Sequence, residues 1–118
     1  MMHTDLDVWK KSMDLTEQFY RVTKEFPKIE QYTLVSQMRR AALSIPSNIA
    51  EGASRRTTKD YLRFLYYSLG STSELETQCM LSERLEYYDF SCNNQLTDIK
   101  RMLTALIKSL EKSIHHKS

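Results

Sequence analysis

The chain has few of the residues that interrupt helices or cross-link small proteins. Among its 118 residues are only two glycines, two prolines and two cysteines. Because Val, Ile and Thr do not alternate with polar residues as they do in strands, the composition predicts long helices joined by short turns. No apolar run approaches the roughly 20 residues that span a bilayer, and the first residues lack the apolar core of a secretory leader. We therefore expect an all-α, cytoplasmic protein.

Cysteine and histidine are too scattered to indicate a metal site or a disulfide framework. Cys79 and Cys92 have no histidine at ligand spacing, which is typical of reduced thiols. His3, His115 and His116 stand near the ends of the sequence, and no Glu-x-x-His pair accompanies them. The sequence thus predicts no bound metal ion and no cofactor.

Catalytic motifs are also lacking. The chain has neither a glycine-rich phosphate loop nor a nucleophile elbow. Glu74 and Glu76 invite comparison with a catalytic pair of carboxylates. Two positions apart on a helix, however, they point in different directions and cannot act on one substrate atom. We therefore expect no catalytic residues and a protein that is not an enzyme.

Helical periodicity is what the sequence does contain. Apolar residues recur at spacings of three and four over four segments, as they do on the core side of helices. Short linkers between these segments fit an antiparallel up-down four-helix bundle, and the length suits one domain. The predicted domain spans residues 1–118, with helices over residues 5–25, 34–53, 59–87 and 93–114.

Pro46 and Gly70 are helix-breaking residues that stand well inside predicted helices. Pro46 lies in the segment QMRRAALSIPSNIAEG, residues 37–52. It lacks a backbone N–H and its ring clashes with the preceding turn, at a cost of about 3 kcal/mol in an unsupported helix. We expect a kink or local break just before Pro46, with compensation from outside the helix. Gly70 is expected to mark a tight helix crossing or a local irregularity.

The apolar arcs on three of the helices are wider than one core requires. Either they are tolerated surface residues or they are reserved for another subunit, and the abundance of Tyr and Met favours association. An arginine at a subunit boundary needs a carboxylate partner, which Glu51 or Glu74 would supply to Arg40; the alternative is a solvated Arg40. The residues predicted to serve assembly or local structure are Arg39, Arg40, Pro46, Asn48, Glu51 and Glu74.

Positive charge is concentrated in one part of the chain. The net charge is only +2, but residues 34–63 carry six basic and two acidic side chains, whereas residues 64–89 carry one and five. Arginine suits phosphate because its planar fork donates two hydrogen bonds, and nearby tyrosines can stack on unpaired bases. The alternative is a solvated turn. The predicted nucleic-acid contacts are Arg55, Arg56, Lys59 and Arg63.

Five motifs occur in an order that resembles one bacterial family. They are LDVWK (6–10), FP (26–27), QMRRAALSIPSNIAEG (37–52), RFL (63–65) and GSTSELE (70–76). Together they closely resemble the four-helix-bundle 23S rRNA intervening-sequence proteins, from Leu6 to about Tyr87. Thr33 departs from the pattern, because the family usually has glycine there after a tyrosine.

The resemblance implies an assembly and a class of ligand. Members of this family form a ring, typically of five subunits, and most have no established activity. A related branch, the accessory variability protein of diversity-generating retroelements, forms a basic pentameric barrel that binds a reverse transcriptase and nucleic acid. We therefore predict a homopentamer that binds RNA, DNA or a ribonucleoprotein. The alternative is a structural or scaffold ring whose partner is a protein and not a nucleic acid.

Overall fold

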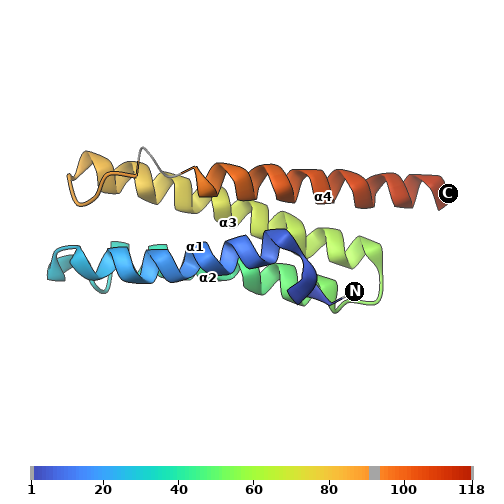
Figure 1. Cartoon of the computed structure of the whole chain (residues 1–118), viewed down its shortest axis with the longest axis horizontal. Helices are drawn as coiled ribbons and strands as arrows, with labels where there is room; N and C mark the ends of the chain where they lie inside the picture. The colour runs from blue at the N-terminus through green and yellow to red at the C-terminus, as the bar shows by residue number, and fades with distance from the viewer. Residues whose placement is uncertain (1, 91–93, 118) are drawn as a thin grey trace.

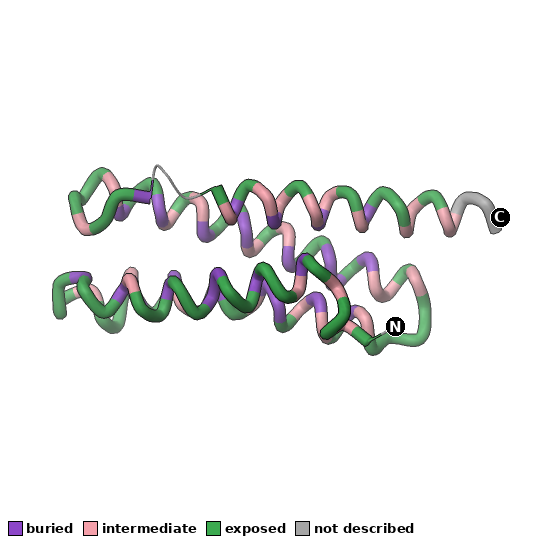
Figure 2. Tube along the Cα trace, in the orientation of Figure 1, coloured by how far each residue is buried: buried purple, intermediate pink, exposed green. Residues whose placement is uncertain are grey.

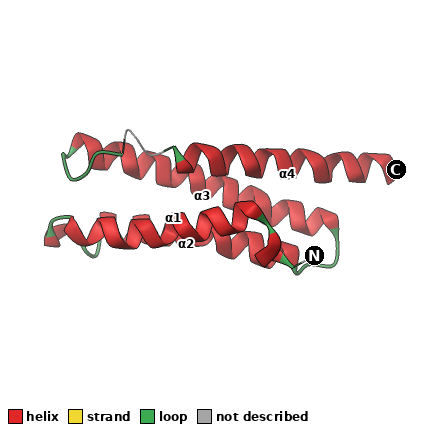
Figure 3. Cartoon of the chain, in the orientation of Figure 1, coloured by secondary structure: helices red, strands yellow, loops and turns green. Residues whose placement is uncertain are grey.

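The computed structural model describes residues 2–90 and 94–117, with the side chains of residues 2–90 and 94–114. Within these ranges the chain forms α-helices and short 3-10 helices and no strands, which confirms the predicted all-α class (Figure 3). The four α-helices are α1 (Asp7–Val22), α2 (Leu34–Ala53), α3 (Thr58–Arg84) and α4 (Gln95–Lys117). The 3-10 helices are η1 (His3–Asp5), η2 (Thr23–Glu25) and η3 (Lys28–Glu30).

The helices lie along a common direction in an elongated body of 52 × 22 × 21 Å. Each helix packs against the next one in the chain, and α4 also contacts α1. Figure 1 shows both ends of the chain toward the end of the bundle that carries the α2–α3 turn. The opposite end carries the connection between α1 and α2. At the end that carries the α2–α3 turn, η1 contacts α2.

The C-terminal ends of three helices differ from the predicted bounds, and the starts of α1 and α3 differ by two residues and one residue. α1 stops at Val22 because η2 tightens the following turn before Phe26 and Pro27. α3 stops at Arg84, and Glu86 has φ 62°, a left-handed conformation that turns the chain away from the helix. α4 continues to Lys117. Its predicted start at residue 93 lies outside the described residues.

The apolar stripes of the four helices face a single core. Figure 2 shows the buried residues following the inward side of each helix. Burial of these side chains removes apolar surface from water, which is the main favourable contribution to folding. The largest side chains with almost no exposure are Phe19, Leu15, Met38, Ile45, Ile49, Leu65, Leu75, Ile99 and Leu103.

α2 passes through Pro46 without a break. The proline is buried, and the helix is continuous from Leu34 to Ala53, so the local break expected before Pro46 is not formed. Proline cannot donate to the carbonyl four residues earlier, which belongs to Ala42. That carbonyl accepts a hydrogen bond from the Thr16 hydroxyl of α1, at 3.0 Å. The compensation thus comes from a neighbouring helix.

The two glycines have opposite surroundings. A Cβ on Gly52 would lie 2.9 Å from Cβ of Phe64 and 2.9 Å from Cδ1 of Tyr61, so Gly52 permits the close approach of α2 and α3. A Cβ on Gly70 would have no neighbour within 4 Å. The expectation that Gly70 marks a tight crossing is therefore wrong within the subunit, since this glycine faces open space.

Candidate nucleic-acid interface

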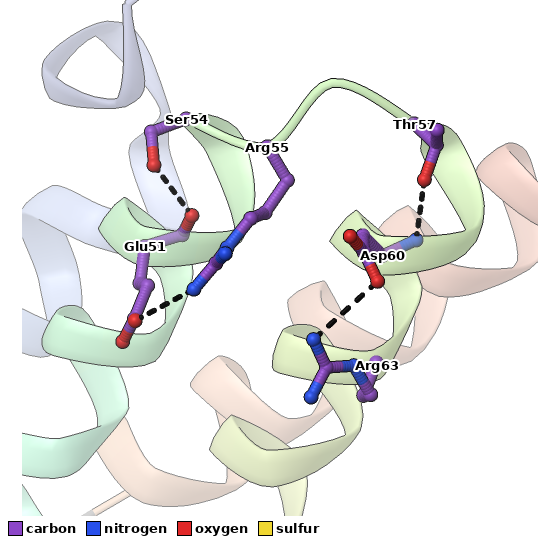
Figure 4. A network of polar contacts seen from close by, with 6 residues as sticks. All are labelled: Glu51, Ser54, Arg55, Thr57, Asp60 and Arg63. Atoms are coloured by element: carbon purple, nitrogen blue, oxygen red, sulfur yellow. Dashed lines mark hydrogen bonds and ion pairs between the residues drawn. The ribbon is translucent and has the colours of Figure 1, made fainter.

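The basic turn between α2 and α3 is held in place by hydrogen bonds at the two helix ends (Figure 4). The Ser54 hydroxyl donates to the Glu51 carbonyl oxygen at 2.7 Å, where α2 ends. Thr57 precedes α3, and its hydroxyl oxygen accepts from the backbone N–H of Asp60 at 3.1 Å. Such a cap satisfies a donor that the first turn of a helix otherwise leaves free. The turn therefore presents its basic side chains from two fixed helix ends.

Arg55 and Arg63 are both held by carboxylates and by an aromatic ring. Arg55 pairs with Glu51 at 2.9 Å, and Arg63 pairs with Asp60 at 3.4 Å. Both guanidinium groups lie over the ring of buried Phe64, at 4.6 and 4.7 Å from its centroid. Each ion pair is about half exposed to solvent, so it contributes little to the stability of the fold. A phosphate that displaces the Glu51 or Asp60 carboxylate from its arginine therefore loses little binding free energy in doing so.

Arg56 and Lys59 differ from these two arginines because they are exposed and have no ion pair or hydrogen bond within the described part of the chain. An unpaired cation on a surface gains more from a phosphate than one that must first leave a carboxylate. Of the four predicted contacts, Arg56 and Lys59 can therefore bind an anion without first losing an internal partner.

Arg39 is occupied inside the subunit. Its Nε donates to the Thr23 hydroxyl at 2.9 Å and its Nη2 to the Tyr20 carbonyl oxygen at 3.0 Å. The guanidinium also lies 4.8 Å from the centroid of the Tyr20 ring. Arg39 therefore fastens α2 to the end of α1, which is a structural role within one chain.

Arg40, the next residue, is exposed and has no polar partner in the described residues. The carboxylate of Glu51 is instead paired with Arg55. Among the described residues, the Glu74 carboxylate accepts only a long hydrogen bond from the Gln78 amide, at 3.4 Å. Neither of the carboxylates suggested by the sequence therefore binds Arg40 within the subunit.

Other parts of the predicted assembly motif make local contacts. The Asn48 amide donates to the Ser44 carbonyl oxygen at 2.8 Å, and the Ser44 hydroxyl donates to the Ser71 hydroxyl of α3 at 2.5 Å. Beside them an open groove of about 610 Å³ is lined by Tyr20, Tyr32, Arg40 and Leu43, among others. Tyr32 is 86% exposed. This part of α2 therefore combines internal hydrogen bonds with an uncovered aromatic and basic surface.

A contact between α3 and α4 was not foreseen from the sequence. The Tyr66 hydroxyl donates to a carboxylate oxygen of Glu111 at 2.6 Å, and this hydrogen bond raises the pKa of Tyr66. The two residues are far apart in sequence, so periodicity along either helix carries no signal of their contact. The contact brings the last turns of α4 beside the basic start of α3.

The described residues form neither a metal-binding cluster nor a membrane span. Among them, no group of three or more His, Cys, Asp and Glu side chains is arranged to hold a metal ion. Within the same ranges, no helix is both long and apolar enough to cross a membrane.

The fold and the turn define the class of molecule: a small all-α helical bundle with an exposed basic connection between its second and third helices. Residues 4–112 match the family described as 23S rRNA-intervening sequence protein, so the chain belongs to that family. The resemblance based on the sequence motifs is thereby confirmed.

A solved structure supports the same assignment. The chain is similar to a protein of unknown function from the S23 ribosomal protein family of Bacteroides thetaiotaomicron, with 26% identity and a TM-score of 0.78. The similarity covers 86% of this chain and 95% of that one. No match to a curated protein was found.

Proposed function

We propose that this chain is a non-enzymatic, homo-oligomeric binding protein of the cytoplasm whose ligand is RNA, DNA or a ribonucleoprotein. The observation that carries the proposal is the basic cluster at the α2–α3 turn and the start of α3. There Arg56 and Lys59 are exposed and unpaired among the described residues, with Arg55 and Arg63 beside them. Backbone phosphates suit this arrangement because every nucleotide offers an anion at regular spacing. The names of the family and of the similar structure, which refer to 23S rRNA and to a ribosomal protein family, agree with such a ligand.

The proposal includes an up-down antiparallel bundle assembled as a ring of five subunits. Arg40 supports assembly because it is an exposed cation without a partner in the described part of its own chain, on a surface that also carries Tyr32 and Leu43. Glu74 of a neighbouring subunit is the carboxylate proposed for it. In a ring, each basic turn is repeated, so weak contacts add through a high effective concentration.

Binding is tested by titrating labelled structured RNA and single-stranded DNA at two or more salt concentrations. Phosphate contacts release counterions, so the affinity should fall steeply as salt rises, and the double variant Arg56→Gln/Lys59→Gln should weaken binding to all sequences alike. Absence of binding at low salt, or binding that is indifferent to salt, would contradict the proposal. Assembly is tested separately by light scattering, where a monomer at micromolar concentration would contradict the ring.

The second candidate is a scaffold ring that binds another protein. It is favoured by the groove beside Arg40 and by the exposed Ile29 and Tyr32, which are 83% and 86% accessible. Aromatic side chains and arginine are enriched where proteins meet. A pull-down with and without nuclease distinguishes the two: a partner protein that stays bound after nuclease treatment supports the scaffold.

A further inference from the structure

The relative position of α3 and α4 follows from two contacts. Lys100 of α4 pairs with Glu76 of α3 at 2.9 Å, and Glu111 of α4 accepts from Tyr66 of α3 at 2.6 Å. The two helices therefore run in opposite directions here, since Lys100 to Glu111 on α4 spans nearly as many residues as Glu76 back to Tyr66 on α3. With a rise of 1.5 Å per residue in both helices, Lys108 lies near the level of Gly70, and Lys112 near that of Tyr66.

Lys108 and Lys112 are exposed and have no polar partner among the described residues. One turn apart, they share a face of α4. Lys108 also borders an open groove of about 530 Å³, whose lining contains no carboxylate. Its lining residues are Thr97, Lys100, Arg101, Thr104, Ala105 and Lys108. Glu111 keeps its negative charge when it accepts from Tyr66, so Lys108, Glu111 and Lys112 together carry a formal net charge of +1.

The presence of a glycine at position 70 is not explained by packing within the subunit. Gly70 lies inside α3, where glycine is less favourable than alanine, and it is exposed, with nothing within 4 Å of the position that a Cβ would occupy. No packing among the described residues requires it. One turn earlier, Tyr66 exposes about half of its surface, 51%. An open backbone beside an accessible aromatic ring suits a ligand that approaches α3 closely.

We propose that the nucleic-acid surface continues from the α2–α3 turn along α3 onto α4, with Lys108 and Lys112 as further phosphate contacts. The ligand class is single-stranded nucleic acid, because the Tyr66 ring offers a stacking surface to an unpaired base. This inference rests on the proposed function. Figure 1 shows the α2–α3 turn and the end of α4 toward the same end of the bundle. The surface from Lys59 to Gly70 is about 16 Å long at the helical rise.

The test compares two double variants that remove equal charge. Lys108→Gln/Lys112→Gln alters the proposed surface, whereas Lys24→Gln/Lys28→Gln alters two exposed lysines near the opposite end, in η2 and η3. Labelled oligouridine is titrated at several salt concentrations. Two lost contacts should lower the salt slope by about 1.4 and weaken binding by roughly an order of magnitude at 0.1 M salt. The Lys24 and Lys28 variant should retain the parental slope.

The outcomes separate this inference from the function on which it rests. If Lys108→Gln/Lys112→Gln binds like the parent while Arg56→Gln/Lys59→Gln does not, the extension onto α4 is wrong and the basic turn remains. Equal weakening by the Lys24 and Lys28 variant would also overturn it, because overall charge would then explain the effect. A parent protein that binds structured RNA but not oligouridine overturns this inference alone, and one that binds neither of these nor single-stranded DNA at low salt overturns both proposals.

The stacking of a base on the Tyr66 ring is tested with two further variants. Tyr66→Phe keeps the ring and removes the hydrogen bond to Glu111, whereas Tyr66→Leu removes the ring. We expect Tyr66→Phe to bind nearly as well as the parent and Tyr66→Leu to bind several-fold more weakly, with both variants folded by circular dichroism. Equal affinities for the two variants would contradict stacking at this position.

Discussion

Thr16 and Ala42 are joined by a hydrogen bond that replaces one lost to proline. The Thr16 hydroxyl of α1 lies 3.0 Å from the Ala42 carbonyl oxygen of α2, which has no helical donor because Pro46 stands four residues later. The same hydroxyl lies 2.7 Å from the Ser12 carbonyl oxygen, so one proton serves two acceptors. Both side chains are buried, and water does not compensate for a missing bond there.

Thr16→Val is therefore expected to lower the free energy of unfolding by about 1–3 kcal/mol, the cost of a buried carbonyl without a donor. Urea denaturation measures the change. Thr77→Val is the matched control, because among the described residues the exposed Thr77 hydroxyl donates only to the Ser73 carbonyl oxygen of its own helix. The variant Pro46→Ala restores a backbone N–H for Ala42. In that background Thr16→Val should cost less, and an unchanged cost would show that the two residues are not coupled.

Gly52 and Gly70 should respond to alanine in opposite ways. A Cβ at position 52 would lie 2.9 Å from side-chain atoms of Phe64 and Tyr61, so Gly52→Ala must separate α2 from α3. We expect a loss of about 1–3 kcal/mol of stability. Gly70→Ala meets open space and should raise stability by up to about 1 kcal/mol, through helix propensity alone. Thermal denaturation of the two variants checks the signs, and destabilisation by Gly70→Ala would reveal packing at that position.

Local sequence patterns were sufficient to predict the helices but not the partners of individual side chains. Apolar spacing is repeated within each helix, so the stripes that contain Ile45 and Leu65 could be recognised without knowing the fold. The bond between Thr16 and Ala42 depends on how two helices meet, and no pattern along either helix encodes it. The same holds for Tyr66 and Glu111.

At the candidate site, too, the type of residue could be predicted from the sequence, whereas the partners of individual side chains could not. The cluster of basic side chains over residues 55–63 followed directly from the sequence, but which of these cations lack a partner did not. Arg55 and Arg63 resemble Arg56 and Lys59 in the sequence, and only their positions over Phe64 and beside carboxylates distinguish them. The proposed contacts Lys108 and Lys112 were not predicted from the sequence, because their position relative to α3 depends on how the two helices pack.

Cys79 should react with thiol reagents only after unfolding. Burial raises its pKa from 9.0 to about 12, with smaller contributions from Glu83 and Glu76. At pH 8 the fraction of reactive thiolate is then roughly 1,000-fold lower than for an ordinary cysteine of pKa 9. Labelling should be followed by mass spectrometry in a Cys92→Ser variant, with and without urea. Rapid labelling in native buffer would contradict a closed environment for Cys79.

The same shift predicts a direction for stability against pH. The folded state resists loss of the Cys79 proton, whereas the unfolded chain loses it near pH 9. The contribution of this thiol is therefore complete below pH 9 and is lost as pH rises toward 12. Because tyrosines also titrate in this range, Cys79→Ala is the reference protein, and its unfolding free energy should fall less steeply from pH 9 to 11.

Arg39 and Arg40 are adjacent arginines with different expected roles. Arg39 donates to Thr23 and to the Tyr20 carbonyl, so Arg39→Ala should lower the stability of each subunit by about 1–3 kcal/mol. Arg40 has no partner among the described residues of its own chain, so Arg40→Ala should leave a dissociated subunit folded and shift the oligomer toward smaller species. Light scattering over a range of protein concentrations, together with urea denaturation, separates the two effects. If Arg40→Ala keeps the parental assembly but abolishes nucleic-acid binding, Arg40 belongs to the ligand surface instead. A residue that joins two subunits should weaken the assembly when it is removed, before any effect on the ligand.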